Sequence, residues 1–305
     1  MAEIVQDQAE GLRRLFARDF VRVITVAGGR TSVGKTHVVI NLAISLARRG
    51  KRVLVLDSQH GRGNLDTLLG IKPRYNLTHV IRRERTLEEV MVEGPNGVGI
   101  IQAAHGLKSL AGLSVTDQNW LVHSFSQLPR PPDVVLVDAG SAGAQSSLSL
   151  AAQEIVIVVS GHRDSITDAY GLIKSLSRNF SRRHFHILVN KVESAHEARA
   201  VYANMAQVAG RFLDVTLDFM GFVPFDEKLK RSVMLCRSMA EAYPAAEGAS
   251  PFKEMAAAVD QWPYPSGDSG RIESFMERLI VSSRLTEEVF NQEAFDREAF
   301  NSGVV

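Results

Sequence analysis

Short apolar runs recur along the chain, and each is followed by a polar or Gly-rich segment. We interpret seven of them as strands, at residues 21–26, 53–57, 98–103, 133–138, 154–160, 185–190 and, as a short edge strand, 221–224. Most residues in these runs are apolar, and they do not alternate regularly with polar ones. This pattern is typical of strands that are covered on both faces, as in a parallel sheet.

Between the runs, apolar residues recur at helical spacing. The pattern predicts helices at residues 37–49, 117–128, 165–177, 194–209 and 252–259, and a loop at 106–112. Strands that alternate with helices indicate an α/β fold, a mostly parallel twisted sheet with helices on both faces.

The chain divides into three parts. Residues 1–19 are a charged lead-in, residues 20–263 form the α/β domain, and residues 264–305 are a linker and a helical tail. The tail places Phe275, Met276 and Leu279 at helical spacing, but it holds more acidic than basic residues. A helix on an anionic membrane usually has a basic polar face. Packing on the parent domain or on a partner therefore weighs as much as membrane binding.

Composition narrows the class of protein. The chain has 305 residues, 45% of them hydrophobic and 23% charged, with a formal net charge of +1. Such a balance creates no overall field that points to nucleic acid or membrane. The single cysteine, Cys236, excludes an internal disulfide and a cysteine-cluster metal site. No signal-peptide core or membrane-spanning run is visible, so we expect a cytoplasmic protein.

The first strand leads into a phosphate-binding motif. From Gly29 to Thr36 the spacing is G-x-x-x-x-G-K-T, between a strand and a helix. Backbone N–H groups of such a loop converge on phosphate oxygens, and the lysine reaches the β- and γ-phosphates. The alternative is a Gly-rich turn with a solvated lysine. The predicted nucleotide-binding residues are Gly29, Arg30, Thr31, Ser32, Val33, Gly34, Lys35, Thr36 and His37.

Two further strands end in carboxylates. Asp57 closes the strand VLVLD, and Asp138 closes DVVLVD, about 100 residues after the phosphate loop. The carboxyl ends of parallel strands meet at the ligand-binding edge of a sheet. Oxygen ligands are those that Mg²⁺ prefers. We expect Thr36, Asp57 and Asp138 to hold a magnesium ion beside the phosphates.

Several motifs together resemble a known family. GGRTSVGKT, VLVLDSQHGRGNLDTLLG and VVLVDAGSAG are similar to motifs of the MinD/ParA family of phosphate-loop ATPases. DQAEGLRRL, SITDAYGLIK and RFLDVTLDFMGFVPFDEKLKRSV resemble its FlhG/FleN-type branch, the MinD-like regulators of flagellar number and placement. The resemblance runs over residues 7–263. It implies ATP or ADP with Mg²⁺ as cofactors.

The resemblance also implies partners. Members form a homodimer with ATP between the subunits, and the dimer attaches to the inner face of the cell membrane through a C-terminal helix. In the flagellar branch an N-terminal segment stimulates the GTPase of FlhF, a signal-recognition-particle-type partner. Other partners are a flagellar transcriptional activator and basal-body (C-ring) proteins. The positions that match the segment are Asp7, Gln8, Ala9, Leu12 and Arg13. From composition alone, this segment is equally a frayed helix docked on its own domain.

The family's base-binding positions match Asn190, which would read the adenine edge, and Pro224 and Asp226, which would close over the base. Without the resemblance, Asn190 is interpreted as the cap of a turn and Asp226 as a solvated carboxylate.

The chain departs from the family pattern at three places. Arg30 stands where the family has a lysine that reaches the partner's phosphates, and Thr31 and Ser32 stand where it has glycines. Gln59 replaces the second Asp of a D-x-D switch motif that orients the attacking water. A glutamine cannot accept the proton of that water. The resemblance assigns catalysis to Lys35, Arg30, Asp57 and Gln59, and we expect binding of nucleotide with slow or absent hydrolysis.

Other functions compete with a regulatory switch. One is a scaffold of the same family that has lost turnover. A dethiobiotin-synthetase-like ligase leaves the N-terminal segment and the tail without a role. A ParA-type DNA partition protein would need phosphate contacts, for which the Arg-rich run 177–186 is short, so nucleic acid is not an expected partner. His60, His105 and His162 do not have metal-ligand spacing and are interpreted as surface residues.

Overall fold

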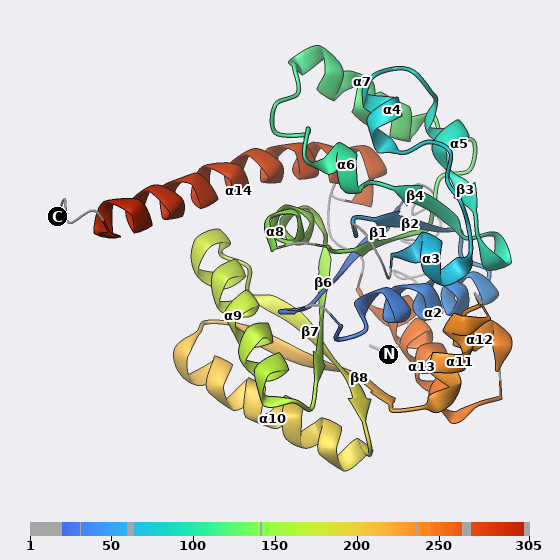
Figure 1. Cartoon of the computed structure of the whole chain (residues 1–305), viewed down its shortest axis with the longest axis vertical. Helices are drawn as coiled ribbons and strands as arrows, with labels where there is room; N and C mark the ends of the chain where they lie inside the picture. The colour runs from blue at the N-terminus through green and yellow to red at the C-terminus, as the bar shows by residue number, and fades with distance from the viewer. Residues whose placement is uncertain are drawn as a thin grey trace, which may run out of the picture.

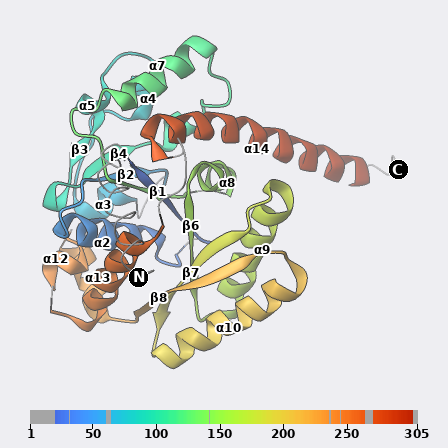
Figure 2. The ribbon, with the colours of Figure 1, turned by 180° about the vertical axis from the view of Figure 1, so that it is seen from behind.

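An eight-stranded sheet forms the centre of the molecule (Figures 1 and 2). The computed structural model describes residues 20–30, 32–59, 64–140, 142–235, 237–243, 245–263 and 270–301. The strand order is β3-β4-β2-β5-β1-β6-β7-β8, and only the β3–β4 pair is antiparallel. The strands are β1 (Arg22–Ala27), β2 (Val53–Asp57), β3 (Val92–Glu93), β4 (Gly99–Gln102), β5 (Val134–Asp138), β6 (Glu154–Ser160), β7 (His184–Val192) and β8 (Thr216–Pro224).

Helices cover both faces of the sheet, as the sequence predicts. The long ones are α2 (Lys35–Arg48), α7 (Val115–Ser126), α8 (Ala142–Ala151), α9 (Arg163–Phe180), α10 (Ala195–Phe212), α13 (Ser250–Gln261) and α14 (Ile272–Asn301). The short ones are α3 (Leu65–Leu69), α4 (Leu77–Ile81), α5 (Leu87–Val90), α6 (Ala104–Leu107), α11 (Glu227–Met234) and α12 (Met239–Ala242), with 3₁₀ turns η2 (Pro95–Gly97) and η3 (Glu247–Ala249).

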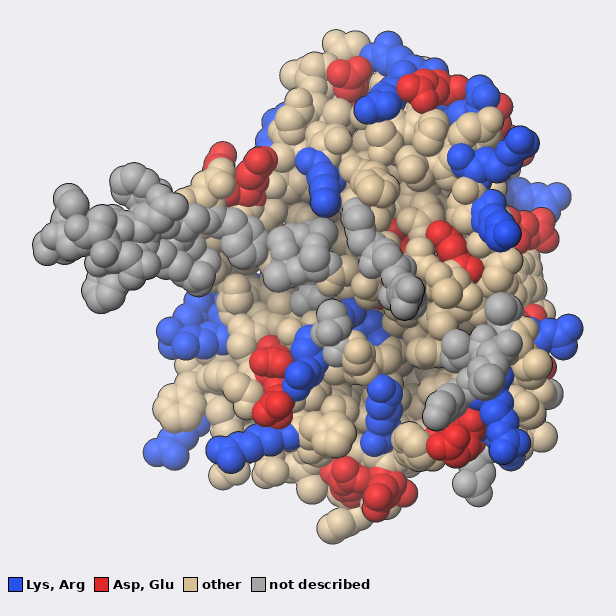
Figure 3. All heavy atoms as spheres, viewed as in Figure 1, with Lys and Arg blue, Asp and Glu red and all other residues tan. Residues whose placement is uncertain are grey.

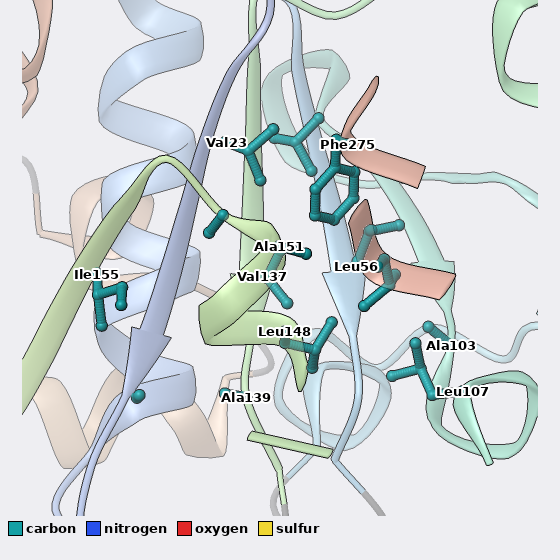
Figure 4. Close-up of a cluster of buried hydrophobic side chains, with 14 of the residues drawn as sticks. Val23, Leu56, Ala103, Leu107, Val137, Ala139, Leu148, Ala151, Ile155 and Phe275 are labelled. Carbon is teal, nitrogen blue, oxygen red and sulfur yellow. The ribbon is translucent and has the colours of Figure 1, made fainter. Parts of the chain in front are cut away.

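The apolar strands separate two hydrophobic cores. Along β5, Val135 and Val137 face the core below α8, α9, α10 and α14, whereas Val134 and Leu136 face the core below α2 and α13. Successive side chains of a strand point to opposite faces, so a strand between two cores has no polar side. Figure 4 shows the first core, where Val137 of β5 and Leu148 of α8 lie near Phe275 of α14.

Two local predictions were wrong, and one long helix was not predicted. Strand β8 begins at Thr216 instead of residue 221, because its alternating first half, TLDFM, pairs with β7 before a bulge near Gly221. Helix α6 enters the segment 106–112 that we expected to be a loop. The sequence also gave no signal for α8, because its run of Ala, Gly and Ser resembles a loop. Its buried Leu148 and Ala151 place it against the sheet.

The tail helix α14 is part of the molecule's core at its start. Ile272, Phe275, Met276 and Leu279 are at most 4% exposed, and they pack in the same core as β1 and β5. Further along, Val281 and Leu285 are about half exposed, and the helix extends away from the sheet towards the C-terminus (Figures 1 and 2). Within the part of the chain that the structure describes, no helix is long and apolar enough to cross a lipid bilayer.

Candidate nucleotide-binding site

The phosphate loop lies between the ends of three neighbouring strands. Strand β1 pairs with β5, with Val26 opposite Asp138, and β5 pairs with β2, with Asp57 opposite Asp138. The loop that follows β1 therefore begins beside both carboxylates. Residues that are about 80 to 100 positions apart in the sequence meet at one edge of the sheet, as the spacing of the motifs predicts.

The loop backbone needs its glycines. Gly34 caps α2 with φ 95°, in the left-handed region, and a Cβ atom there would lie 2.4 Å from Asn190 Nδ2. A Cβ atom on Gly29 would lie 2.1 Å from the backbone carbon of Asp168. Ser32 also has a positive φ, 67°, at a position where the family has glycine. The loop thus accepts a serine in a conformation that costs roughly 1 kcal/mol for a non-glycine residue.

Lys35 opens α2 and is buried, with its Nζ donating to the carbonyl oxygen of Arg30 at 3.3 Å. Burial lowers the pKa of Lys35 from its usual value, and the nearby Asp138 partly opposes this effect. A buried ammonium at the start of a helix is placed to neutralise an anion. The phosphates of a nucleotide are the anions that this loop geometry fits.

Asp57 and Asp138 form a buried acidic pair. Burial and then the neighbouring Asp138 raise the pKa of Asp57 to about 8. Burial raises the pKa of Asp138 to about 6, against the lowering effects of hydrogen bonds from Thr36 and Gln59 and of the Lys35 charge. Two carboxylates in one buried site favour a shared proton or a cation.

The acidic pair fits a magnesium ion. The Oδ2 atom of Asp138 is fully buried and has no hydrogen-bond partner among the residues that the structure describes, and Asp138 lies within hydrogen-bond reach of the Thr36 hydroxyl. An unpartnered buried carboxylate oxygen is costly unless a ligand or ion satisfies it. Thr36 and Asp138 provide hard oxygen ligands of the kind that Mg²⁺ prefers. Asp57 accepts hydrogen bonds from the N–H groups of Gln59 at 2.8 Å and Leu65 at 3.0 Å, and its role as a metal ligand stays a prediction.

Gln59 lies beside the acidic pair. Its Nε2 donates to Asp138 Oδ1 across 3.4 Å, a long hydrogen bond. An amide here can hold a water or an oxygen of a ligand, but it cannot accept a proton as a carboxylate can. Ser58, beside it, fixes the strand ends: its Oγ donates to the carbonyl oxygen of Asp138 and accepts from the N–H of Gly140.

Asn190 is held against the phosphate loop. Its Nδ2 donates to the carbonyl oxygen of Val33 at 2.7 Å, and its Oδ1 accepts from the N–H of Lys191. Lys191 Nζ donates to the carbonyl oxygen of Ser32, also at 2.7 Å. The end of β7 therefore braces the loop through two side chains, of which only Asn190 was predicted from the sequence.

The imidazole of His37, beside the loop, is neutral. Burial and then the Lys191 charge lower the pKa of His37 to about 4.

The Arg30 side chain is paired with acidic residues of its own chain. Its guanidinium lies 3.3 Å from an Asp164 carboxylate oxygen and 3.7 Å from Asp168, both on α9. All three side chains are substantially exposed, so these ion pairs are weak. They hold the arginine near the loop without preventing it from turning to another anion.

Pro224 and Asp226 lie at the end of β8, next to β7 in the sheet, so the predicted base-binding segments adjoin. Asp226 Oδ1 accepts from the N–H of Lys228 at 2.8 Å and so caps the start of α11. Thr31 and the N-terminal positions predicted to bind a partner, Asp7, Gln8, Ala9, Leu12 and Arg13, lie outside the described residues.

Sequence analysis missed a polar extension of the site. Gln102, at the end of β4, donates from Nε2 to Asp66 Oδ2 at 2.6 Å and to Asp57 Oδ2 at 3.1 Å. Burial raises the pKa of Asp66, and its buried Oδ1 has no hydrogen-bond partner within the described part of the chain. Gln102 and Asp66 border a pocket of about 270 Å³ that Gln59 also lines. The sequence does contain a signal for Gln102, because this polar residue ends an apolar run, and the structure pairs that strand with β2.

Comparisons with known proteins agree with this geometry. The family described as "CobQ/CobB/MinD/ParA nucleotide binding domain" matches residues 24–235. The antiactivator FleN of Pseudomonas aeruginosa is 41% identical over 262 residues, which are 85% of this chain and 94% of that protein. The flagellum site-determining protein YlxH of Helicobacter pylori is 32% identical over 218 residues, 70% of this chain and 72% of that one.

Solved structures share the fold. The MinD cell division protein of Aquifex aeolicus superposes with a TM-score of 0.63 at 21% identity, over 80% of this chain and 98% of that one. The septum site-determining protein MinD of Pyrococcus horikoshii, solved with Mg-ADP, gives a TM-score of 0.62 at 18% identity, over 79% and 96% of the two chains.

Proposed function

The chain belongs to the MinD/ParA family, in its FlhG/FleN-type flagellar branch, and on this premise we propose that it is a nucleotide-dependent regulator of flagellar number and placement. It binds ATP or ADP with Mg²⁺ at the end of the sheet and acts as a switch that dimerises with ATP. The observation that carries the proposal is the unpartnered, buried Oδ2 of Asp138 beside Lys35 and Thr36.

The proposed division of roles follows from position. Loop N–H groups and Lys35 bind the β- and γ-phosphates, while Thr36 and Asp138 hold Mg²⁺, which neutralises phosphate charge when bound. Asn190 and Lys191 keep the loop in the shape that its left-handed residues require. Arg30, already near the loop, is placed to turn from its weak pairs on α9 to the phosphates of a second subunit.

Nucleotide binding is tested by calorimetry with ATP and ADP in the presence and absence of Mg²⁺. Lys35→Ala should abolish binding, and Asp138→Asn should remove the Mg²⁺ dependence while it leaves a weaker Mg²⁺-independent affinity. If wild-type protein binds neither nucleotide, or if Lys35→Ala binds as tightly as wild type, the proposal is wrong.

We propose further that the nucleotide is hydrolysed slowly. Gln59 occupies the place of a carboxylate, and its amide already donates to Asp138, so the described site holds no proton acceptor at this position. A scaffold that retains its nucleotide is the second candidate, favoured by the same observation. Single-turnover hydrolysis with protein in excess separates the two: a slow but Lys35-dependent rate identifies an ATPase switch, and no release of phosphate over hours identifies the scaffold.

Partner stimulation is a separate proposal. By analogy with the flagellar branch, the segment with Asp7, Gln8 and Arg13 activates an FlhF-type GTPase. A matched test adds wild-type chain, or an Asp7→Ala/Arg13→Ala variant, to such a GTPase. Only the wild type should accelerate GTP hydrolysis, while both chains bind ATP equally. Equal acceleration by both chains would remove this role from the segment.

We also propose that the chain attaches to the inner face of the cell membrane, and the structure limits which residues can make this contact. The first apolar positions of α14 are in the core, so an interfacial contact would have to use exposed residues such as Val281 and Leu285 or residues further along. Co-sedimentation with anionic vesicles in ADP and in a non-hydrolysable ATP analogue tests it. Recovery in the pellet only with the analogue supports a switch at the membrane, and recovery in neither state contradicts it.

DNA partition has weaker support. Within the run 177–186, Arg182 donates to the carbonyl oxygen of Ala152, and Arg183 is paired with Asp214 at 2.6 Å. Both guanidinium groups already have partners on their own chain. On the face shown in Figure 3, basic and acidic side chains are interspersed, and phosphate backbones are bound where basic groups gather.

A further inference from the structure

A second cluster of polar groups lies at the opposite edge of the sheet from the phosphate loop. Glu154 is the first residue of β6, His184 and His186 are the first and third residues of β7, and Asp218 is the third of β8. These strands are neighbours, and the four residues share the sheet face covered by α2 and α13. Strand β6 is about 20 Å long, so this edge is remote from the nucleotide.

Three side chains converge on one point. His186 Nε2 lies 3.0 Å from Glu154 Oε2, and His184 Nδ1 lies 4.0 Å from the same oxygen. One ligand atom from each of the three residues can be chosen so that all lie within 4.8 Å of one another. In a tetrahedral zinc site, bonds of 2.0 to 2.1 Å place the ligand atoms about 3.4 Å apart. Small side-chain rotations are enough to close the set around an ion.

The surroundings hold these groups in place. His184 Nε2 is hydrogen-bonded to Asp218 Oδ2 at 2.6 Å, which leaves Nδ1 facing Glu154. The ring of His186 stacks on Trp262 with centroids 4.1 Å apart and planes 8° from parallel. A carboxylate behind a histidine is the usual support of a metal-binding imidazole, because it fixes the ring and raises its basicity.

Two arginines lie near the acidic member of the cluster: Arg22, and Arg182, whose charge interacts with that of Glu154. Arg22 lies 3.9 Å from Glu154 Oε1, the oxygen that faces away from the histidines, and its NH2 donates to the carbonyl oxygen of Trp262. Arg22 therefore orients Glu154 through Oε1 and weakens the attraction of this carboxylate for a metal ion. The other oxygen, Oε2, still faces the two histidines.

We propose that Glu154, His184 and His186 form a binding site for a divalent transition metal ion of the zinc type, with Asp218 as the supporting carboxylate. Two imidazoles and one carboxylate are ligands that zinc takes in proteins, whereas Mg²⁺ prefers oxygen ligands alone. The ion joins β6 to β7 beside the end of α13. Its role is structural, since the nucleotide lies at the other edge of the sheet.

Trp262 provides a local reporter. The chain has two tryptophans, Trp120 and Trp262, so a Trp120→Phe protein fluoresces from the ring that stacks on His186. In this protein, with Mg²⁺ in excess to occupy the nucleotide site, added Co²⁺ should quench the fluorescence with a stoichiometry of one. Zn²⁺, which has a filled d shell, should then displace Co²⁺ and restore the signal.

Variants identify the ligands. His184 is half exposed, so His184→Gln should fold, and it should raise the Co²⁺ midpoint by about 100-fold or more, whereas Asp218→Asn should raise it by about 10- to 100-fold. His196→Gln, an exposed histidine on α10, is the matched control and should leave the midpoint unchanged. Circular dichroism verifies that each variant is folded.

The proposal is overturned if Co²⁺ fails to quench Trp262, or if the midpoint is the same in wild type and His184→Gln. A midpoint that shifts equally in His184→Gln and His196→Gln would indicate adventitious surface binding and would also overturn it. Nucleotide binding is measured separately and decides neither result.

Discussion

The buried acidic pair makes a quantitative prediction about stability and pH. The perturbation is Asp138→Asn in Mg²⁺-free buffer without nucleotide. Asp138 Oδ1 accepts a hydrogen bond from Gln59, while Oδ2 has no partner among the described residues. An asparagine can therefore keep the accepted hydrogen bond and direct its NH₂ group to the unpartnered side. The substitution removes the titration of one carboxylate with little change in packing.

The sign follows from the raised pKa values. Folding raises the pKa of Asp138 from 3.8 to about 6, so the folded chain binds more protons than the unfolded chain between these values. The stability from this protonation is fully present below pH 3.8 and is lost as the pH rises through about 6, at about 1.4 kcal/mol per pH unit per proton. The wild type should therefore lose about 3 kcal/mol relative to Asp138→Asn between pH 4 and pH 7.

The assay is urea unfolding of both proteins at half-unit steps from pH 4 to pH 8. The difference in unfolding free energy, variant minus wild type, should increase with pH, and any constant offset from the substitution cancels in the slope. Because Asp57 loses a charged neighbour in the variant, its own pKa falls, which adds to the slope. Parallel curves, with a difference constant to within about 0.5 kcal/mol, would refute the assignment of a buried protonated pair.

Three further predictions follow from other parts of the structure. Gly34→Ala should abolish nucleotide binding, measured by calorimetry, because its Cβ atom would lie 2.4 Å from Asn190 Nδ2. Gly50→Ala is the control: its φ of 81° is similar but nothing described lies within 4 Å of the added Cβ atom, so it should bind normally and lose only about 1 kcal/mol of stability. Equal nucleotide binding by both variants would contradict the proposed role of Gly34 in the loop. Gln59→Asp should raise single-turnover hydrolysis with Mg²⁺ by about 10²-fold or more, since it restores a proton acceptor, and an unchanged rate would show that another group limits the reaction. Phe275→Ala should cost about 3 to 5 kcal/mol in urea unfolding and Leu285→Ala less than about 0.5, and similar costs would contradict the docking of α14 in the core.

The sequence was most informative where an apolar run that predicts a strand is followed by a charged residue. The apolar runs predicted the central strands, because a strand between two cores has no polar face to confuse the pattern. Lys35, Asp57 and Asp138 could be placed together from their positions after strands alone. Helix α8 was missed because its small residues pack by shape instead of hydrophobicity, a property that appears only when the neighbouring surfaces are known.

The contacts that hold the site were less predictable. Lys191 braces the carbonyl oxygen of Ser32 across 159 positions of sequence, and no local pattern marks such a pair. The cluster of Glu154, His184 and His186 was also overlooked, although His-x-His in a strand places both rings on one face. Its third member depends on the pairing of β6 with β7. Residue types give the chemistry, but strand order decides which residues meet.

The central claim is that bound nucleotide sets the assembly state of the chain. Light scattering of the full chain with Mg²⁺ and either ADP or a non-hydrolysable ATP analogue tests it most directly. The account predicts a monomer with ADP and a dimer with the analogue, and no dimer with the analogue for Lys35→Ala. The same mass in both nucleotides, with binding verified in the same samples, would contradict it.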